Sequence, residues 1–132
     1  MSGAVIIHMN KAMQNSTHAD GVIAESAIYQ KLLRRHGGRQ LTNEELRDCH
    51  HLVVEHLPEM NELLASRQYM FSRSGYRVCM LLRFGFKPKD ISGMLDLTPG
   101  RVSQICAKAL HDLFGEENGG AAELAEKLRQ IG

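Results

Sequence analysis

Two short helical patterns joined by three residues constrain the fold of this 132-residue chain more than any other feature. Pro88 and Pro99 each suit the first position of a helix, where no intrahelical bond needs a backbone N–H. The apolar residues after each proline repeat at the three-to-four-residue spacing of an amphipathic helix. The sequence therefore predicts a helix over 88–95 and a longer one over 99–114, with Thr98 as the N-cap of the second.

Further helix signals divide the remainder of the chain. Thr42 and Glu45 form a capping box, which predicts a helix that begins close to Asn43. Pro58 cannot lie in an unbroken helix, so this helix should be interrupted there. Apolar periodicity predicts three more helices, namely one from Gly21 to about His36 with Asp20 as its cap, one from Ser72 to Gly85, and one from Ala121 to Ile131.

These patterns assign the chain to the all-α class, as a helical bundle with a C-terminal helix-turn-helix unit. Composition agrees, because only 5% of the residues are aromatic, Trp is absent, and three prolines are too few for a turn-rich sheet domain. We expect a loose N-terminal arm over 1–19 with a short helix near 4–13, a helical support region over 20–68, the helix-turn-helix domain over 72–115, and a short helix over 121–131.

Several classes of protein are excluded by the same sequence. The longest apolar run in its body, residues 78–82, is far shorter than the ~20 residues that a membrane span needs. The apolar patch at 4–7 ends at His8 and does not have the pattern of a signal peptide. The three cysteines form no CxxC pair, which argues against a disulfide framework or a zinc knuckle. We therefore expect a cytoplasmic protein that makes no membrane contact through this segment.

Charge is distributed unevenly, although the net charge of the chain is only +1. Residues 67–111 carry eight Lys and Arg against two Asp, a net charge of +6, whereas residues 1–66 carry −2 and residues 112–132 carry −3. A basic segment in a nearly neutral protein is typical of a module that binds phosphates. The alternative is a basic, solvated face that has no partner.

The predicted helix over 99–114 has two distinct faces. Its inner stripe is apolar and consists of Val102, Ile105, Ala109 and Leu113. Its polar stripe consists of Arg101, Gln104, Lys108 and His111. In a major groove Arg recognises guanine, Gln recognises adenine, and Lys contacts guanine or phosphate. The pattern therefore predicts a recognition helix, and an ordinary amphipathic helix with a polar outer face is the alternative reading.

Phosphate contacts are predicted around the same two helices. Lys87 and Lys89 belong to the basic segment, and Ser103 and the free N–H groups near Thr98 and Gly100 can hold a phosphate at a helix N-terminus. The partner would be double-stranded DNA. The full predicted set of DNA-binding residues is Lys87, Lys89, Thr98, Gly100, Arg101, Ser103, Gln104, Lys108 and His111.

The stretch YRVCMLLRFGFKPKDISGMLDLTPGRVSQICAKALHDLFG resembles the C-terminal helix-turn-helix of LuxR-type and sigma-factor region-four proteins. It is most similar to a group of transcriptional regulators from Bacteroides-type bacteria, and the resemblance covers roughly residues 24–131. It implies an all-helical domain without a wing that binds promoter DNA through its last major helix. Positions that touch DNA in such proteins correspond here to Thr98, Arg101, Ser103, Gln104 and Lys108.

The resemblance also implies a wider setting. In that family the module usually ends a longer chain that carries sensor, tetratricopeptide or transmembrane parts, so sensor domains and RNA polymerase become expected partners beside DNA. This chain departs from the family pattern at four positions. Gly75 replaces a capping Glu, Asp96 replaces a small residue in the turn, and Cys106 and Asp112 stand where basic residues are expected. These departures support a second hypothesis, a protein-interaction module that has lost DNA binding.

Other chemistry finds little support in the sequence. His51 and Glu55 share a helix face at a spacing that can chelate a metal, but a site needs three or four converging ligands and no third is evident. Nucleophile, dinucleotide-binding and phosphate-loop motifs are absent from the sequence. We therefore expect neither an enzyme nor a bound metal or cofactor, and we expect Cys79 and Cys106 to be small core residues.

Overall fold

The computed structural model describes residues 18–35, 39–67 and 73–131. All regular structure in these ranges is α-helical, which confirms the predicted all-α class. A first helical stretch covers residues 18–25, and the helices after it are α2 (Ala27–Leu33), α3 (Asn43–His56), α4 (Pro58–Ser66), α5 (Arg73–Arg83), α6 (Pro88–Leu95), α7 (Pro99–Phe114) and α8 (Ala121–Ile131). The expected short helix over 4–13, the expected helix end near His36 and the expected helix start at Ser72 lie outside the described residues.

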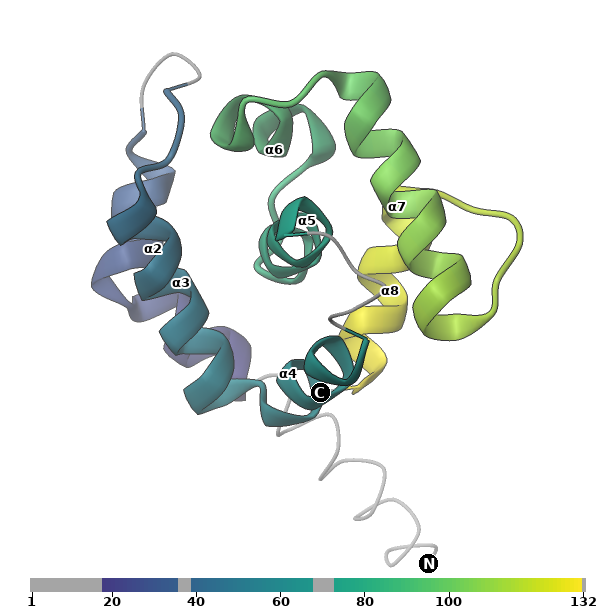
Figure 1. The fold of residues 1–132 in the computed structure, drawn as a ribbon. Coiled ribbons are helices and arrows are strands. Elements are labelled where there is room, and N and C mark those ends of the chain that lie inside the picture. The colour runs from purple at the N-terminus through teal and green to yellow at the C-terminus, as the bar shows by residue number, and fades with distance from the viewer. Residues whose placement is uncertain (1–17, 36–38, 68–72, 132) are drawn as a thin grey trace, which may run out of the picture.

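Helix α5 lies at the centre of the bundle, with α2 and α3 on one side of it and α7 and α8 on the other (Figure 1). It packs against α3, α6, α7 and α8. The apolar run over 78–82 accounts for this position, because each of its residues is at most 3% exposed and a helix that is apolar all round has to be buried. The buried apolar residues, from Ala19 to Leu128, form one cluster around α5.

The start of α3 follows the sequence prediction closely. The Thr42 side chain accepts a hydrogen bond from the Glu45 backbone N–H at 3.1 Å, and the Glu45 carboxylate accepts one from the Thr42 N–H at 2.9 Å. At the other end α3 stops at His56 and α4 begins at Pro58, as expected. Leu57 joins the two helices and is fully buried, so the interruption keeps the apolar stripe in the core.

The prediction of one helix from Gly21 to about His36 was wrong. The chain breaks at Ser26, whose backbone is extended and whose hydroxyl donates to the Ile23 carbonyl at 2.7 Å and accepts from the Tyr29 N–H at 3.2 Å. A serine that bonds to nearby backbone in this way competes with helical hydrogen bonds. The second helix then ends at Leu33.

The role expected for Asp20 was also wrong. Residues 18–20 are already helical, so Asp20 lies inside the first helical stretch and is not its cap. Ala19, which we had placed in a loose arm, is only 5% exposed and belongs to the core. None of the helices in the described part of the chain combines the length and apolar character needed to cross a lipid bilayer.

Candidate nucleic-acid interface

The connection between α6 and α7 is a tight turn fixed by hydrogen bonds. Asp96 adopts the left-handed conformation with φ 54° and caps the end of α6. The Leu97 N–H donates to the Ser92 carbonyl at 2.9 Å, and the Ser92 hydroxyl donates to the Leu97 carbonyl. Asp tolerates the left-handed region better than most residues with a Cβ. The left-handed conformation therefore gives a reason for Asp96 at a position where a small residue was expected. The turn also sets the relative placement of the two helices.

Helix α7 begins as the sequence predicted. The Thr98 hydroxyl accepts a hydrogen bond from the Arg101 N–H at 3.1 Å, and Pro99 is the first helical residue. Three residues form the start of the helix. Pro99 has no backbone N–H, and the N–H of Arg101 donates to the Thr98 hydroxyl. Among these three residues, the Gly100 N–H is therefore left for a ligand. An added Cβ at Gly100 would meet no atom within 4 Å, so a phosphate could approach this backbone closely.

The two faces of α7 are those predicted. Val102, Ile105, Ala109 and Leu113 are each at most 8% exposed and pack into the core. The outer face is exposed along its length and carries Gly100, Arg101, Ser103, Gln104, Ala107, Lys108 and His111. The burial pattern therefore brings five of the predicted polar DNA-binding side chains together on one continuous surface, named here the outer face of α7.

One cation of the outer face has an intramolecular partner that the sequence reasoning missed. Lys108 Nζ lies 2.9 Å from Asp112 Oδ2, one turn further along α7. The Lys108 side chain is 66% exposed and the Asp112 side chain is 7% exposed, so water reaches this pair from the lysine side. A phosphate could therefore compete for Lys108. The i, i+4 spacing of the two residues was a signal that could have revealed the pair.

Lys87 and Lys89 do not join the outer face of α7. Both are exposed at the start of α6, and Lys87 precedes its first residue. Eight helical residues span about 12 Å, which separates these lysines from the turn that leads into α7. Lys87 instead borders a pocket between α2 and α6. The predicted residues thus fall into two groups rather than one.

The basic segment over 67–111 is not a single surface. Arg83 is 2% exposed and pairs through its Nη1 with Asp20 Oδ1 in the first helical stretch. This arginine therefore serves the fold and is not available to a nucleic acid. Arg73 and Arg77 lie on α5 and face a pocket that also involves α3. Counting charge along the sequence therefore overstated the cations on the α7 side of the molecule.

Burial weakens one argument for the protein-interaction hypothesis, which took Cys106 as a position where a basic residue is expected. Cys106 is fully buried, so no side chain at this position could reach a nucleic acid without a change in packing. Cys49 and Cys79 are also fully buried. Burial raises the pKa of Cys49 to about 12 and that of Cys106 to about 11, and it raises the pKa of Cys79 further still. These thiols are core residues, as we predicted for Cys79 and Cys106.

Among the residues that the structure describes, no three His, Cys, Asp or Glu side chains are grouped closely enough to hold a metal ion. The predicted pair of His51 and Glu55 thus gains no further ligand from the described chain.

Comparison with known proteins adds no identification. The chain matches no family model, no curated protein and no solved structure. The resemblance to LuxR-type and region-four domains therefore stays a prediction from the sequence, and function has to be argued from the geometry of the surface itself.

Proposed function

We propose that this protein binds double-stranded DNA through α6 and α7, which would act as a helix-turn-helix with α7 in the major groove. The observation that carries the proposal is the outer face of α7. Its side chains are exposed and of the types that read base edges, and the opposite face is fixed in the core. A rigid helix with one free polar face meets the geometric requirement for a groove-reading element.

Within this surface, different residues would have different tasks. Arg101 and Gln104 lie in the first two turns of α7, the part of a recognition helix that enters the groove, and would contact guanine and adenine edges. Lys108, Ser103 and the Gly100 N–H would contact phosphates and position the helix. His111, one turn further along, would add a contact at the edge of the groove.

The biological role that follows is a transcription regulator's DNA-binding module in the cytoplasm of a bacterium. Sensor domains of a longer chain and RNA polymerase are the protein partners that this role would involve. The proposal assigns no catalytic step to the protein.

Salt dependence of DNA binding tests the phosphate part of this proposal. Replacing Lys108 by Ala should reduce the slope of log K against log salt by about one, because one phosphate contact is lost. Lys89→Ala should have the same effect if α6 also meets the backbone. Lys127→Ala, on α8 and paired with Glu116 at 3.3 Å, is the matched control and should leave the slope unchanged. Equal slopes for wild type and Lys108→Ala would argue against this face.

A second function, a protein-interaction module, is favoured by one observation. Asp112 holds Lys108, so the outer face of α7 carries only a small net positive charge. A helix face with Gln, Ser, His and one unpaired Arg also suits a protein partner. Absence of any salt-sensitive binding to duplex DNA at low ionic strength would favour this second function.

A further inference from the structure

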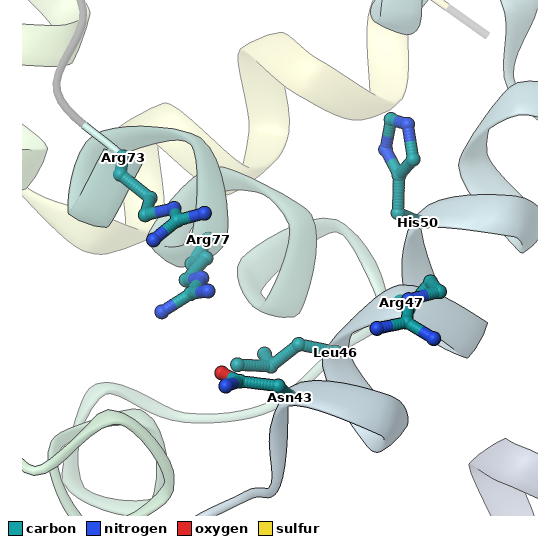
Figure 2. A pocket seen from close by; sticks show the side chains of 6 residues that line it. All are labelled: Asn43, Leu46, Arg47, His50, Arg73 and Arg77. Atoms are coloured by element: carbon teal, nitrogen blue, oxygen red, sulfur yellow. The ribbon is translucent and has the colours of Figure 1, made fainter.

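A basic pocket between α3 and α5 is left unused by the proposed function. Its volume is about 480 Å³, and Asn43, Leu46, Arg47, His50, Arg73 and Arg77 line it. Figure 2 shows Arg73 and Arg77 projecting from α5 on one side of this space and Arg47 and His50 on α3 at the other. Three guanidinium groups and an imidazole thus surround one opening, with Leu46 as the sole apolar side chain among its lining residues.

The arginines of this pocket have no carboxylate partner among the residues that the structure describes. Within residues 18–35, 39–67 and 73–131, no ion pair involves Arg47, Arg73 or Arg77, although ion pairs elsewhere engage Arg39, Arg83 and Arg129. The residues outside the described ranges contain no Asp or Glu, so they cannot supply a missing side-chain carboxylate. An external anion could therefore supply a counter-charge for the pocket.

Two of these unpaired cations also repel each other on α5. Arg73 and Arg77 are four residues apart on one helix, and like charges at this spacing repel each other. Partial burial lowers the pKa of Arg77, and the charge of Arg73 lowers it further. An anion held between the two guanidinium groups would remove this repulsion.

The imidazole side of the pocket is held in place. His50 Nδ1 is hydrogen-bonded with the Tyr76 hydroxyl at 2.5 Å, and the two rings pack edge to face with centroids 5.4 Å apart. Tyr76 belongs to α5, so this contact joins the two helices that form the pocket. It also leaves the second ring nitrogen of His50 available to a ligand.

The geometry points to a binding site for the phosphate dianion of a small molecule, either free phosphate or a phosphomonoester. A phosphomonoester carries a charge of about −1.5 to −2 near neutral pH and has three strong acceptor oxygens. Guanidinium groups match phosphate oxygens through paired N–H donors. Because the lining is almost entirely polar, the pocket would recognise the charged group rather than an apolar body.

This site is separate from the proposed DNA surface. Helix α3 lies on one side of α5 and α7 on the other (Figure 1), so the phosphate pocket and the outer face of α7 belong to different parts of the molecule. The inference does not depend on whether the protein binds DNA.

Calorimetric titration of the full chain with inorganic phosphate, in a chloride buffer at low ionic strength, tests the proposal. Wild type should bind one phosphate per chain. Arg73→Gln and Arg77→Gln should each weaken this binding about tenfold or more, and the double variant should abolish it. Arg129→Gln, on α8 and outside both proposed binding surfaces, is the control and should bind phosphate as wild type does. Far-UV circular dichroism should show that all variants remain helical.

A parallel titration with O-phosphoserine identifies the source of the phosphate. If O-phosphoserine binds more tightly than inorganic phosphate, the result supports the proposal with a phosphomonoester as the ligand. If the two bind equally, the result supports it with free phosphate as the ligand. The proposal is overturned if wild type takes up no phosphate, or if the double variant binds it unchanged. It is also overturned if Arg73→Gln and Arg77→Gln reduce DNA affinity more than Arg101→Gln does, because the pocket would then be part of the DNA surface.

Discussion

The described residues up to 67 and those from 73 onward use their charges in different ways. In the first region, Glu45 is 2% exposed and holds Arg39 and Lys31 with Nη2–Oε2 and Nζ–Oε2 distances of 3.0 Å and 3.7 Å. In the second, the cations of α7 are exposed to solvent and the apolar residues alone form the packing surface. In the first region a buried carboxylate thus holds the cations, whereas the ion pairs within the second region, such as Lys108 with Asp112, leave their cations exposed.

Two arginines are exceptions to this difference between the regions. Arg83, in the basic second region, is buried against Asp20 of the first and contributes to the fold. Arg47, in the acidic first region, lines the basic pocket between α3 and α5, on the opposite side from Arg73. Net charge along the sequence therefore does not report which cations are available, and burial and pairing have to be known.

The largest effect on stability is expected at Glu45. Hydrogen bonds from the Arg39 guanidinium, helped by the Thr42 N–H, lower the pKa of this carboxyl from 4.5 to about 2, against the opposing effect of burial. A lowered pKa stabilises the folded state at pH values above the unfolded pKa, and this stabilisation is lost as the pH falls through the folded pKa. Glu45→Gln should therefore lower the free energy of unfolding by about 3 kcal/mol at pH 7.

Urea unfolding at a series of pH values checks this expectation. The difference between wild type and Glu45→Gln should be constant above about pH 5 and should shrink steadily as the pH falls from 4.5 toward 2. Glu44→Gln changes an exposed neighbour in the same first turn and is the matched control. A difference that does not change with pH would mean that the Glu45 charge does not stabilise the first region.

A smaller effect is expected at the link between the two regions. Asp20→Asn removes the charge that faces the buried Arg83 guanidinium, and because the Asp20 side chain is 50% exposed, the loss should be limited to about 1–2 kcal/mol. Thermal unfolding should detect it as a lower Tm. Glu25→Gln, an exposed residue of the same helical stretch, should leave Tm unchanged. If the two variants unfold alike, the ion pair is not part of what joins the regions.

The smallest effect on stability is expected at Asp112, together with a change in the salt dependence of DNA binding. Asp112→Asn should alter the free energy of unfolding by about 1 kcal/mol or less, since Asn keeps the size of the nearly buried Asp112 side chain and the Lys108 side chain that loses its partner is 66% exposed. It should also release Lys108 and make the salt dependence of DNA binding steeper by up to about one unit of slope. Glu116→Gln makes the same change in net charge away from the outer face of α7. Identical slopes for these two variants would contradict a role for Lys108.

Local signals predicted those parts of the fold that depend on a few neighbouring residues. The capping box at Thr42, the prolines at 88 and 99 and the apolar stripe of α7 all gave elements that the structure contains. In each case the deciding interaction joins residues within about one helical turn. The local failure at Ser26 arose because a side chain that bonds to nearby backbone competes with an otherwise acceptable helical pattern.

Contacts between distant segments could not be predicted in this way. Asp20 and Arg83 are 63 residues apart, and nothing in either segment specifies the register that brings them together. The same holds for the basic pocket between α3 and α5. The sequence shows the i, i+4 spacing of Arg73 and Arg77, but it does not show that Arg47 lines the same pocket. For the outer face of α7 the sequence sufficed, because one helix with one buried stripe contains the whole surface.

A binding-site selection from randomised duplex DNA tests the central claim most directly. Wild type should enrich a preferred sequence at low salt, and Arg101→Ala and Gln104→Ala should each flatten that preference, since a bidentate base contact contributes about 1–3 kcal/mol of discrimination. Arg129→Ala and Gln130→Ala on α8 are the matched controls and should enrich the wild-type sequence. If Arg101→Ala and Gln104→Ala keep the wild-type preferred sequence, the outer face of α7 does not read DNA.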